Sequence, residues 1–398
     1  MEDDDRLLIV IPAYNEEESL AGTIGECLAA KKDIIEKTQV TAVDITVVSD
    51  GSTDGTEEIA RGFGSDISVI AFQTNRGYGA AIKEGFKSTN AGLVGFIDAD
   101  GTCDAGFFVK LCQMIYDGAD VALGSRIHEK SRMPVHRKLG NILFAMLMSL
   151  FSSSRVNDIA SGMRVIRASA LPDLYPLPDD LHFTPSMSAK AILSKKLIIA
   201  ESPMPYHERG GSSKLRAGRH GYLFLKSILE TALLFNPTAL LGITGAACIA
   251  ASLALMAYPG GFYITNLFLE EWMIYRFIFA HMLGVAGLLL LGTGYICHRI
   301  VSIAIPSGPK EEDTGILRAM GSRTAMAAML ALLAFGVALV APSLLERIAT
   351  GHTDEHWSRY VVTSYLFTVA AILFSTRIVD HALCLVSERL EYLRKVNK

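Results

Sequence analysis

The stretch Leu93-Val94-Gly95-Phe96-Ile97-Asp98-Ala99-Asp100-Gly101 indicates both how this chain folds and what it binds. Its apolar half predicts a buried strand, and the two acids place a ligand at the end of that strand. Residues i and i+2 of a strand point the same way, so Asp98 and Asp100 are expected to face one ligand. A hard divalent cation relieves the repulsion between paired carboxylates, and Mg²⁺ typically uses one or two carboxylates plus substrate phosphates. The stretch therefore predicts a metal-bridged nucleotide site.

The segments before this stretch predict an α/β domain. Strands are expected at residues 7–11, 44–48 and 67–72, and helices at residues 17–32, from residue 56 onward and after Ala81. Strands that alternate with helices and are apolar on both faces indicate a parallel sheet, which binds ligands beyond its carboxyl edge. Acidic residues follow three of the four strands, at Glu16 to Glu18, at Asp50 with Asp54, and at Asp98 with Asp100. Their convergence predicts a site at that edge.

Some of these residues also have a plainer interpretation. Ser52 and Asp54 are residue types that cap helix N-termini, so capping of the following helix is an alternative to ligand binding. Gly77 and Gly79 resemble a turn that cradles a phosphate, but a plain turn is equally compatible with a short Gly-x-Gly.

The composition predicts a membrane domain in the second half of the chain. Of the 398 residues 50% are hydrophobic, and the mean hydropathy is +0.32. Four segments approach the roughly 20 apolar residues that cross a bilayer: 237–258, 277–297, 324–345 and 360–376. Arg377 and Asp380 follow the last segment at helical i, i+3 spacing, so they are expected to pair or to reach the interface.

Charge and cysteine usage exclude other classes of protein. The net charge of −4 gives no support for nucleic-acid binding. The six cysteines lack a C-x-x-C spacing, so neither a disulfide scaffold nor a zinc site is indicated. The acidic start lacks the basic region of a signal peptide. Positive charges gather at residues 216–226, 299–323 and 389–398, which places both termini and the first domain in the cytoplasm.

The predicted organisation has four parts. Residues 1–217 form a cytosolic α/β domain, and 218–236 form an amphipathic juxtamembrane helix. Residues 237–387 form a transmembrane domain of about four helices, and 388–398 form a cytosolic tail. A nearly apolar stretch, 142–151, is too short to span a bilayer and is expected to lie in the interface or to be buried in the core.

Several motifs together resemble a known family. Residues 9–16 (IVIPAYNE), 48–54 (VSDGSTD), 75–81 (NRGYGAA) and 98–101 (DADG) stand in the order and spacing of the family 2 glycosyltransferases of the GT-A fold, which is Rossmann-like. Residues 124–126 (GSR), 157–164 (NDIASGMR) and 209–215 (RGGSSKL) resemble the polyprenyl-phosphate branch, which includes dolichol-phosphate mannose synthases and bacterial undecaprenyl-phosphate enzymes. The resemblance covers about the first 235 residues and implies a GT-A domain that binds a nucleotide sugar.

The resemblance also implies roles for individual residues. Nucleotide-sugar contacts are implied for Pro12, Tyr14, Glu16, Val48, Asp50, Gly77, Asp98, Ala99 and Asp100. Contacts with the acceptor phosphate are implied for Arg126, Arg137, Ser161, Arg164, Arg209, Ser213 and Lys214. The residues expected to be catalytic are Asp98, Asp100, Asp158, Arg126 and Arg209, with Asp98 and Asp100 as ligands of Mg²⁺ or Mn²⁺.

Two positions depart from the family pattern. Ser49 stands where many members have an acid, so Asp50 alone would recognise the base. Thr102 stands where mannose synthases often have Gln, which leaves the third protein ligand of the metal open, with Asp104 as a candidate.

The implied function is the inverting transfer of a hexose-type sugar from a nucleotide sugar, such as GDP-mannose or UDP-glucose, to a polyprenyl phosphate. A phosphate monoester is already a nucleophile at neutral pH, so Asp158 is dispensable as a base and is expected to orient Arg164. Two alternatives stay open. One is a family 2 transferase with a hydroxyl acceptor, for which Asp158 or another acid would be the base. The other is a non-catalytic membrane scaffold or flippase partner. The implied partners are the donor, the lipid acceptor and the membrane, and homo-oligomerisation is left open.

Overall fold

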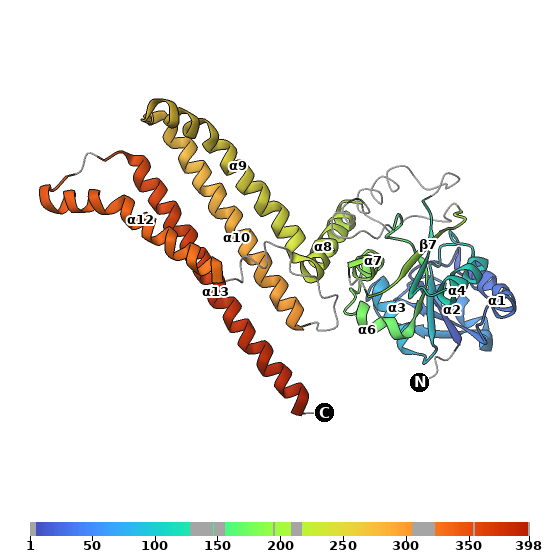
Figure 1. The fold of residues 1–398 in the computed structure, drawn as a ribbon. Coiled ribbons are helices and arrows are strands. Elements are labelled where there is room, and N and C mark those ends of the chain that lie inside the picture. Colours follow the sequence, from blue (N-terminus) through green and yellow to red (C-terminus); the bar gives the residue numbers. More distant parts are fainter. Residues whose placement is uncertain are drawn as a thin grey trace. The chain divides into compact units, whose positions relative to one another are not determined.

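The computed structural model describes residues 5–127, 146, 156–193, 196–207, 217–304, 323–352 and 355–396. The chain divides into two compact units, Met1–Ala232 and Leu233–Lys398, which are both drawn in Figure 1. An α/β unit followed by a helical unit confirms the fold class expected from the sequence.

The first unit is built on a seven-stranded mixed sheet. Its strands are β1 (Arg6–Ala13), β2 (Ala42–Ser49), β3 (Ser68–Ala71), β4 (Leu93–Ile97), β5 (Val121–Ser125), β6 (Met163–Arg167) and β7 (Ile199–Pro203). The strand order is β3-β2-β1-β4-β6-β5-β7. The first four strands run parallel to one another, as the alternation of strands and helices predicts.

The helices of this unit cover both faces of the sheet. They are α1 (Leu20–Lys37), α2 (Thr56–Arg61), α3 (Tyr78–Lys87), α4 (Phe108–Tyr116), α6 (Leu171–Leu174) and α7 (Phe183–Leu193), with short 3-10 turns at Gly64–Asp66, Ala105–Phe107 and Ala168–Ala170. A further helix, α8 (Ala217–Phe235), crosses the boundary between the two units. Alternate residues of β1 enter two different cores: Leu7, Ile9 and Ile11 pack toward α1 and α4, and Leu8 and Val10 pack toward α3 and α7. This double burial explains why β1 is apolar throughout.

The sheet is not parallel throughout, because β6, a strand that was not predicted, runs in the opposite direction. This strand lies between β4 and β5 and runs antiparallel to both. The chain leaves β5 at the carboxyl edge of the parallel strands and re-enters the sheet at the same edge through β6. The residues just after β5 and just before β6 therefore meet at the edge where ligands bind in such sheets.

The second unit consists of long apolar helices. They are α9 (Pro237–Asn266), α10 (Ile274–Ala304), α12 (Arg323–Thr350) and α13 (Trp357–Val396), with a 3-10 turn at Glu271–Met273 before α10. Four helical stretches are long and apolar enough to cross a membrane, namely Pro237–Asn266, Glu271–Ile303, Met326–Thr350 and Trp357–Leu393. Each overlaps one of the four predicted spans. The start of α9 follows from its sequence, because the Asn236 side chain accepts the Ala239 amide at 3.1 Å and Pro237 occupies the first turn.

Candidate active site

The Asp98-Ala99-Asp100-Gly101 segment forms a turn directly after β4. The strand ends at Ile97, and Gly101 takes a φ of +68°, which favours glycine. The expectation that Asp98 and Asp100 point the same way because both belong to a strand was therefore wrong in its premise. Each carboxylate is instead oriented by partners of its own.

Asp98 is held by two neighbours on the sheet edge. Its Oδ1 accepts a hydrogen bond of 2.6 Å from the Tyr78 hydroxyl, and its backbone amide donates to the Gly162 carbonyl at 3.1 Å. A Cβ on Gly162 would collide with the Asp98 carboxylate, so only glycine fits there. Burial and the neighbouring Asp98 charge raise the pKa of Tyr78 well above its usual range, so the hydroxyl keeps its proton and donates it.

Asp100 is held by Thr102. The Thr102 hydroxyl donates to Asp100 Oδ1 at 2.7 Å, and the Thr102 amide approaches the same oxygen at 3.2 Å. Asp104, the alternative third ligand, is committed locally, because its carboxylate accepts the Gly106 amide at 2.8 Å and caps the following turn. Thr102 therefore orients a carboxylate in the place where relatives often offer Gln.

The donor set at this turn fits a hard divalent cation that a substrate completes. Within the residues that the structure describes, no group of three or more His, Cys, Asp or Glu side chains is placed to hold a metal. Two carboxylates in one turn nevertheless match Mg²⁺, which binds through one or two carboxylates while substrate phosphates and waters supply the remaining oxygens. Asp98 and Asp100 would hold the ion, and it would stabilise negative charge on a leaving diphosphate.

Residues predicted to hold the base and ribose lie at the ends of two adjacent strands. Pro12 of β1 is the register partner of Val48 of β2, and Asp50 is the first residue after β2. The Asp50 carboxylate accepts the backbone amides of Arg76 and Gly77 at 2.6 and 2.9 Å. Burial raises the pKa of Asp50, although these two amides and the Arg76 charge oppose the shift. Asp50 thus fixes the turn before α3, and its contact with a base stays a prediction.

The loops after β1 and β2 brace each other. The Asn15 amide donates to the Ser52 hydroxyl at 3.1 Å, and the Thr53 amide donates to Asn15 Oδ1 at 2.7 Å. Asp54 accepts the Thr56 amide at 3.0 Å just before α2, although the N-cap residue of this helix is Gly55 and not Asp54. Nearby, Tyr14 is 36% exposed at the same edge. Roles of Tyr14, Glu16 and Ala99 in donor binding stay predictions.

Gly77 is required for close packing of the turn. Its φ is +106°, and a Cβ there would strike the Asp179 carbonyl. The Gly77 amide bonds to Asp50, and the Ala80 amide donates to the Asp179 carbonyl at 3.0 Å. These two amides are already engaged within the chain, so the geometry favours a structural turn over a phosphate cradle at Gly77.

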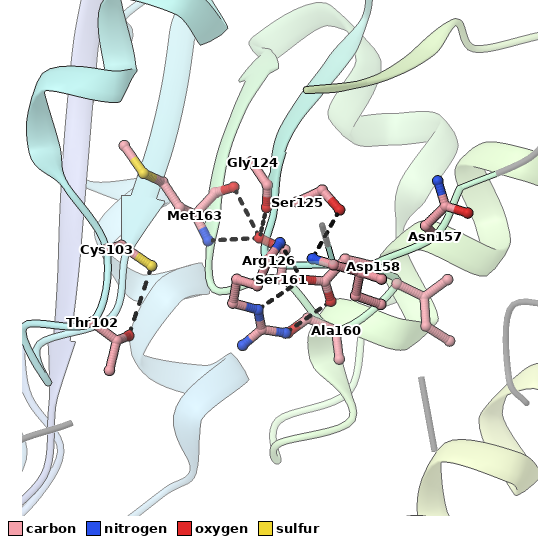
Figure 2. A network of polar contacts seen from close by, with 12 residues as sticks. Thr102, Cys103, Gly124, Ser125, Arg126, Asn157, Asp158, Ala160, Ser161 and Met163 are labelled. Carbon is pink, nitrogen blue, oxygen red and sulfur yellow. Dashed lines mark hydrogen bonds and ion pairs between the residues drawn. The ribbon is translucent and has the colours of Figure 1, made fainter. Parts of the chain in front are cut away.

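A buried ion pair joins the two segments that flank β5 and β6. Arg126 follows β5, and it donates to the Asp158 carboxylate from Nε at 2.7 Å and from Nη2 at 2.8 Å, as Figure 2 shows. The Arg126 amide adds a bond of 2.9 Å, and Nη2 also reaches the Ala160 carbonyl at 2.7 Å. The Asp158 side chain is 0% exposed. Burial alone would raise the pKa of Asp158, but the Arg126 charge and its hydrogen bonds outweigh burial and lower it.

Ser161 and Arg164 hold the same loop from inside. The Ser161 hydroxyl donates to the Gly124 carbonyl at 2.5 Å, and both side chains are fully buried. Arg164 donates to the carbonyls of Ser161 and Ile159 at 3.2 and 2.8 Å, and among the described residues its Nη1 has no hydrogen-bond partner. Burial lowers the pKa of Arg164 to about 10, so the side chain stays a cation at neutral pH. Asp158 was expected to orient Arg164, but the side chain that hydrogen-bonds to the Asp158 carboxylate is Arg126.

The segment after β7 connects the Asp98–Gly101 turn to Arg126. The His207 amide donates to the Thr102 carbonyl at 2.9 Å, and Tyr206 forms a β-bridge with Cys103. The Tyr206 ring lies under the Arg126 guanidinium, with the central carbon 6.0 Å from the ring centroid. The chain continues from here toward Arg209. Arg137, Arg209, Ser213 and Lys214, together with all of the 142–151 stretch except Met146, lie outside the described residues.

Sequence reasoning missed three residues that organise the site. Tyr78 was quoted within a motif but was given no role. Tyr206 lies three residues before Arg209, the start of the 209–215 motif, and this position is the signal by which the sequence could have singled it out. Glu201 of β7 had no signal, yet its carboxylate accepts the amides of Asn157 and Asp158, both at 2.8 Å. Glu201 thereby fixes the loop that carries Asp158.

Comparisons with known proteins agree with this arrangement. Residues 8–174 match the family described as glycosyl transferase family 2. A dolichyl-phosphate hexose transferase of Haloferax volcanii is 34% identical over 235 residues, which are 58% of this chain and 95% of that protein. The low-salt glycan biosynthesis hexosyltransferase Agl6 of the same organism is 32% identical over 231 residues, or 57% of this chain and 54% of that protein.

A dolichyl-phosphate beta-glucosyltransferase of Drosophila melanogaster is 30% identical over 184 residues, which are 42% of this chain and 56% of that protein. The chain thus spans only about half the length of two of these three relatives. Nearly the whole of the Haloferax hexose transferase is matched, however, and residues 8–174 of the family match lie within the unit that carries the site. With its mixed, GT-A-like sheet and these acidic strand ends, the chain belongs to glycosyl transferase family 2.

Proposed function

We propose that this protein transfers a hexose from a nucleotide sugar to the phosphate of a polyprenyl phosphate at a membrane. The observation that carries the proposal is that the acidic Asp98–Gly101 turn and the Arg126 guanidinium lie at the same edge of the sheet. The turn at Asp98–Gly101 is joined through Thr102 and Cys103 to the Tyr206 segment, which lies against Arg126. Dolichyl-phosphate transferases among the relatives support the same acceptor class.

The proposed division of labour follows from charge. Asp98 and Asp100 are acceptor groups suited to a metal-bound diphosphate, and Pro12, Tyr14, Glu16, Val48, Asp50 and Ala99 lie on the donor side. Arginine binds phosphate oxygens through a planar fork, so Arg126 is suited to the acceptor phosphate, with Arg137, Arg209, Ser213 and Lys214 proposed beside it. Ser161 and Arg164 are buried and support Arg126 through the loop that they hold.

The proposed chemistry is a single displacement with inversion. An oxygen of the acceptor phosphate forms the new bond to the anomeric carbon, and the bond from that carbon to the nucleotide diphosphate breaks. A phosphate monoester has a second pKa near 6, so it is nucleophilic at pH 7 without a base. Detection of a product with retained anomeric configuration would overturn this step.

A hydroxyl acceptor is the main competing function, and the position of Asp158 counts against it. A hydroxyl acceptor needs a base within hydrogen-bond reach. Both Asp158 oxygens accept hydrogen bonds from Arg126, and the side chain is 0% exposed. Removing a proton from a substrate would require this buried pair to separate. We therefore assign Asp158 to positioning Arg126, and the polyprenyl-phosphate acceptor is favoured.

We further propose that the helices of the second unit insert into the membrane as four spans. Both termini and the first unit then lie in the cytoplasm, because an even number of spans returns the chain to its starting side. The amphipathic helix α8 would lie at the interface before the first span, and residues 388–398 would form a cytosolic tail. This domain plan keeps the catalytic edge and the lipid acceptor on one side of the membrane.

The test is an assay on membranes that contain the full-length protein. Labelled GDP-mannose, UDP-glucose and UDP-N-acetylhexosamine are each incubated with polyprenyl phosphate, with and without EDTA. The expected result is organic-extractable label from one donor, lost with EDTA and restored by Mg²⁺ or Mn²⁺. Failure of every donor to give such a product would sink the proposal.

Asp100→Ala is the inactive variant for that assay. It removes one of the two carboxylates proposed to hold the metal, so turnover is expected to fall to the background of empty membranes. Extraction of the variant by detergent but not by carbonate would show that its spans still insert. Substantial residual turnover would show that Asp100 does not face the metal or the donor.

A further inference from the structure

The buried face of α1 carries a single hydroxyl group. The buried residues of this helix are Leu20, Thr23, Ile24, Cys27, Ala30 and Ile34. Thr23 is the only one of them with a hydroxyl, and it is 2% exposed. Burying a hydroxyl costs free energy unless it is hydrogen-bonded, so a threonine at this position in an apolar stripe indicates a specific partner.

The Thr23 hydroxyl reaches the turn that follows β4. Its Oγ1 lies 3.2 Å from the Ala99 carbonyl oxygen and 3.4 Å from the Ser19 carbonyl oxygen. The bond to Ser19, one turn earlier in α1, is one that a threonine in any helix can make. The bond to Ala99 is shorter and joins residues 76 positions apart, so it depends on the tertiary fold. Thr23 therefore connects α1 to the Asp98–Gly101 turn.

The direction of the Ala99 carbonyl affects the neighbouring Asp100. This carbonyl belongs to the same planar peptide group as the Asp100 amide, so its direction fixes one side of the Asp100 backbone. Ala99 is 3% exposed and lies in the same apolar core as Leu20 and Ile24 of α1. A hydrogen bond that orients this peptide group therefore also helps to set where the Asp100 side chain points.

Two other backbone hydrogen bonds hold the ends of this segment. The Asp98 amide donates to the Gly162 carbonyl at 3.1 Å, and the Thr102 carbonyl accepts the His207 amide at 2.9 Å. The bond from Thr23 to Ala99 lies between these two along the chain. The backbone that carries both carboxylates is thus tied to three separate segments: the start of β6, the segment after β7, and α1.

The first turn of α1 is also joined to the loop after β1. The Ser19 and Leu20 amides donate to the Glu16 carbonyl at 3.2 and 3.0 Å, and the Glu16 amide donates to the Thr56 hydroxyl at 2.8 Å. This loop carries residues proposed to bind the nucleotide. The start of α1 therefore links the loop on the nucleotide side to the turn on the metal side, and Thr23 makes the second of these connections.

We propose that Thr23 is a positioning residue for the metal that accompanies the sugar donor. Its hydroxyl fixes the peptide group between Ala99 and Asp100, and this holds the Asp100 carboxylate in the direction that a divalent cation requires. The inference rests on the proposed function, in which Asp98 and Asp100 bind that cation. The competing explanation is that the hydroxyl serves only α1 itself, through the Ser19 carbonyl. The two explanations differ in what they predict for metal affinity.

Mn²⁺ binding to the full-length protein in detergent micelles separates the two explanations. Thr23→Val keeps the shape of the side chain and removes the hydroxyl. Loss of a group that orients a metal ligand typically costs 10–100-fold in affinity, and Thr23 acts through the backbone, so a loss of about threefold or more is expected by electron paramagnetic resonance. Thr23→Ser retains the hydroxyl and should bind nearly as well as the wild type. Thr38→Val is the matched control, because it removes a 2.7 Å bond to the Ile34 carbonyl at the other end of α1.

Hydrogen exchange of residues 98–104, measured by mass spectrometry without metal, gives a second readout. Exchange there should be faster in Thr23→Val than in the wild type, and unchanged in Thr38→Val. Equal Mn²⁺ affinity in the wild type and Thr23→Val would overturn the proposal, and so would a failure of Thr23→Ser to restore affinity. A wild type that binds no Mn²⁺ would instead count against the metal site of the proposed function, and the exchange rates would still decide whether Thr23 holds the turn. Neither readout requires glycosyl transfer.

Discussion

At the scale of single residues, the candidate site works through carboxylates that are already oriented. Tyr78 holds Asp98, Thr102 holds Asp100, and Arg126 holds Asp158. Each hydrogen bond to a charged group contributes about 1.5–3 kcal/mol, enough to fix a side chain before substrate arrives. The carboxylates proposed to face the donor would thus need little rearrangement on binding.

Thr102→Val tests whether the hydroxyl prepares Asp100 for a metal. The substitution keeps the shape of the side chain but removes the 2.7 Å bond to Asp100. Loss of an oriented ligand partner typically costs 10–100-fold in metal affinity, so Mn²⁺ affinity is expected to fall by about 10-fold or more. Mn²⁺ binding is measured directly by electron paramagnetic resonance. Thr102→Ser, which retains the hydroxyl, should bind nearly as well as the wild type, and equal affinity in the Val variant would contradict the role.

Asp158→Ala tests the buried ion pair. Removing one partner of such a pair costs about 3–5 kcal/mol, because the remaining charge is left uncompensated. We expect faster hydrogen exchange in β5 and β6, measured by mass spectrometry. Asp33→Ala is the control, because its 2.8 Å contact with Lys37 is exposed and such pairs contribute at most about 1 kcal/mol.

The same pair predicts a pH dependence of stability. The pKa of Asp158 is lower in the folded protein than in the unfolded chain, where it is about 3.9. Its contribution is therefore fully present above about pH 4 and is lost as the pH falls through the lower folded value. The difference in stability between wild type and Asp158→Ala should be constant from pH 6 to 8 and shrink only in acid. A difference that shrinks near neutral pH would contradict this assignment.

At the scale of elements, the position of β7 organises the site. β7 pairs with β5, so its residues reach the carboxyl edge beside Arg126. Glu201 on this strand accepts the amides of Asn157 and Asp158, and the following residues bond back to Thr102. One edge strand thereby connects the loop of Asp158 with the turn of Asp100.

Glu201→Gln tests this connection. The Gln side chain is neutral and has one acceptor oxygen instead of two, so it cannot accept both backbone N–H groups as the carboxylate does. The loop is therefore expected to lose about 1.5–3 kcal/mol of local stability. In the transfer assay, the KM for the lipid acceptor should rise more than kcat falls, because Arg126 loses its fixed position. Glu26→Gln, an exposed position on α1, serves as the control. An unchanged acceptor KM would show that Glu201 is not a positioning residue.

At the scale of the whole molecule, the two units are stabilised by different packing. The first has two apolar cores on a mixed sheet, and the second has helices that meet through small residues. Gly245 and Gly287 bring the backbones of α9 and α10 into close approach, because a Cβ at either position would touch the carbonyl of the other. Small residues are the usual means of packing helices in membranes.

Gly287→Leu is expected to destabilise the helical unit selectively. Overpacking of a close contact costs about 1–3 kcal/mol. Both tryptophans of the chain, Trp272 and Trp357, lie in this unit, so its unfolding can be followed by fluorescence. The fluorescence transition should shift to lower temperature while nucleotide binding by the first unit is unchanged. Gly242→Leu is the control on α9, where a Cβ meets no atom within 4 Å.

The local pattern of residues determined much of this protein. Apolar runs with acids at their ends predicted β1 to β4 and the edge where the site lies, because strand periodicity and burial are local properties. Four apolar segments predicted the four candidate spans, because span length follows from bilayer thickness. The i, i+3 spacing of Arg377 and Asp380 likewise predicted their pairing, which the structure confirms.

The tertiary structure decided what depends on contacts between distant segments. The antiparallel insertion of β6, the grip of Asp158 on Arg126 rather than Arg164, and the role of Glu201 each join residues more than 30 positions apart. The direction of Asp98 was likewise set by Tyr78, which lies 20 positions earlier in the chain, and not by strand alternation. Side-chain partners of this kind are chosen by packing across the sheet, and the local sequence does not encode which candidates meet.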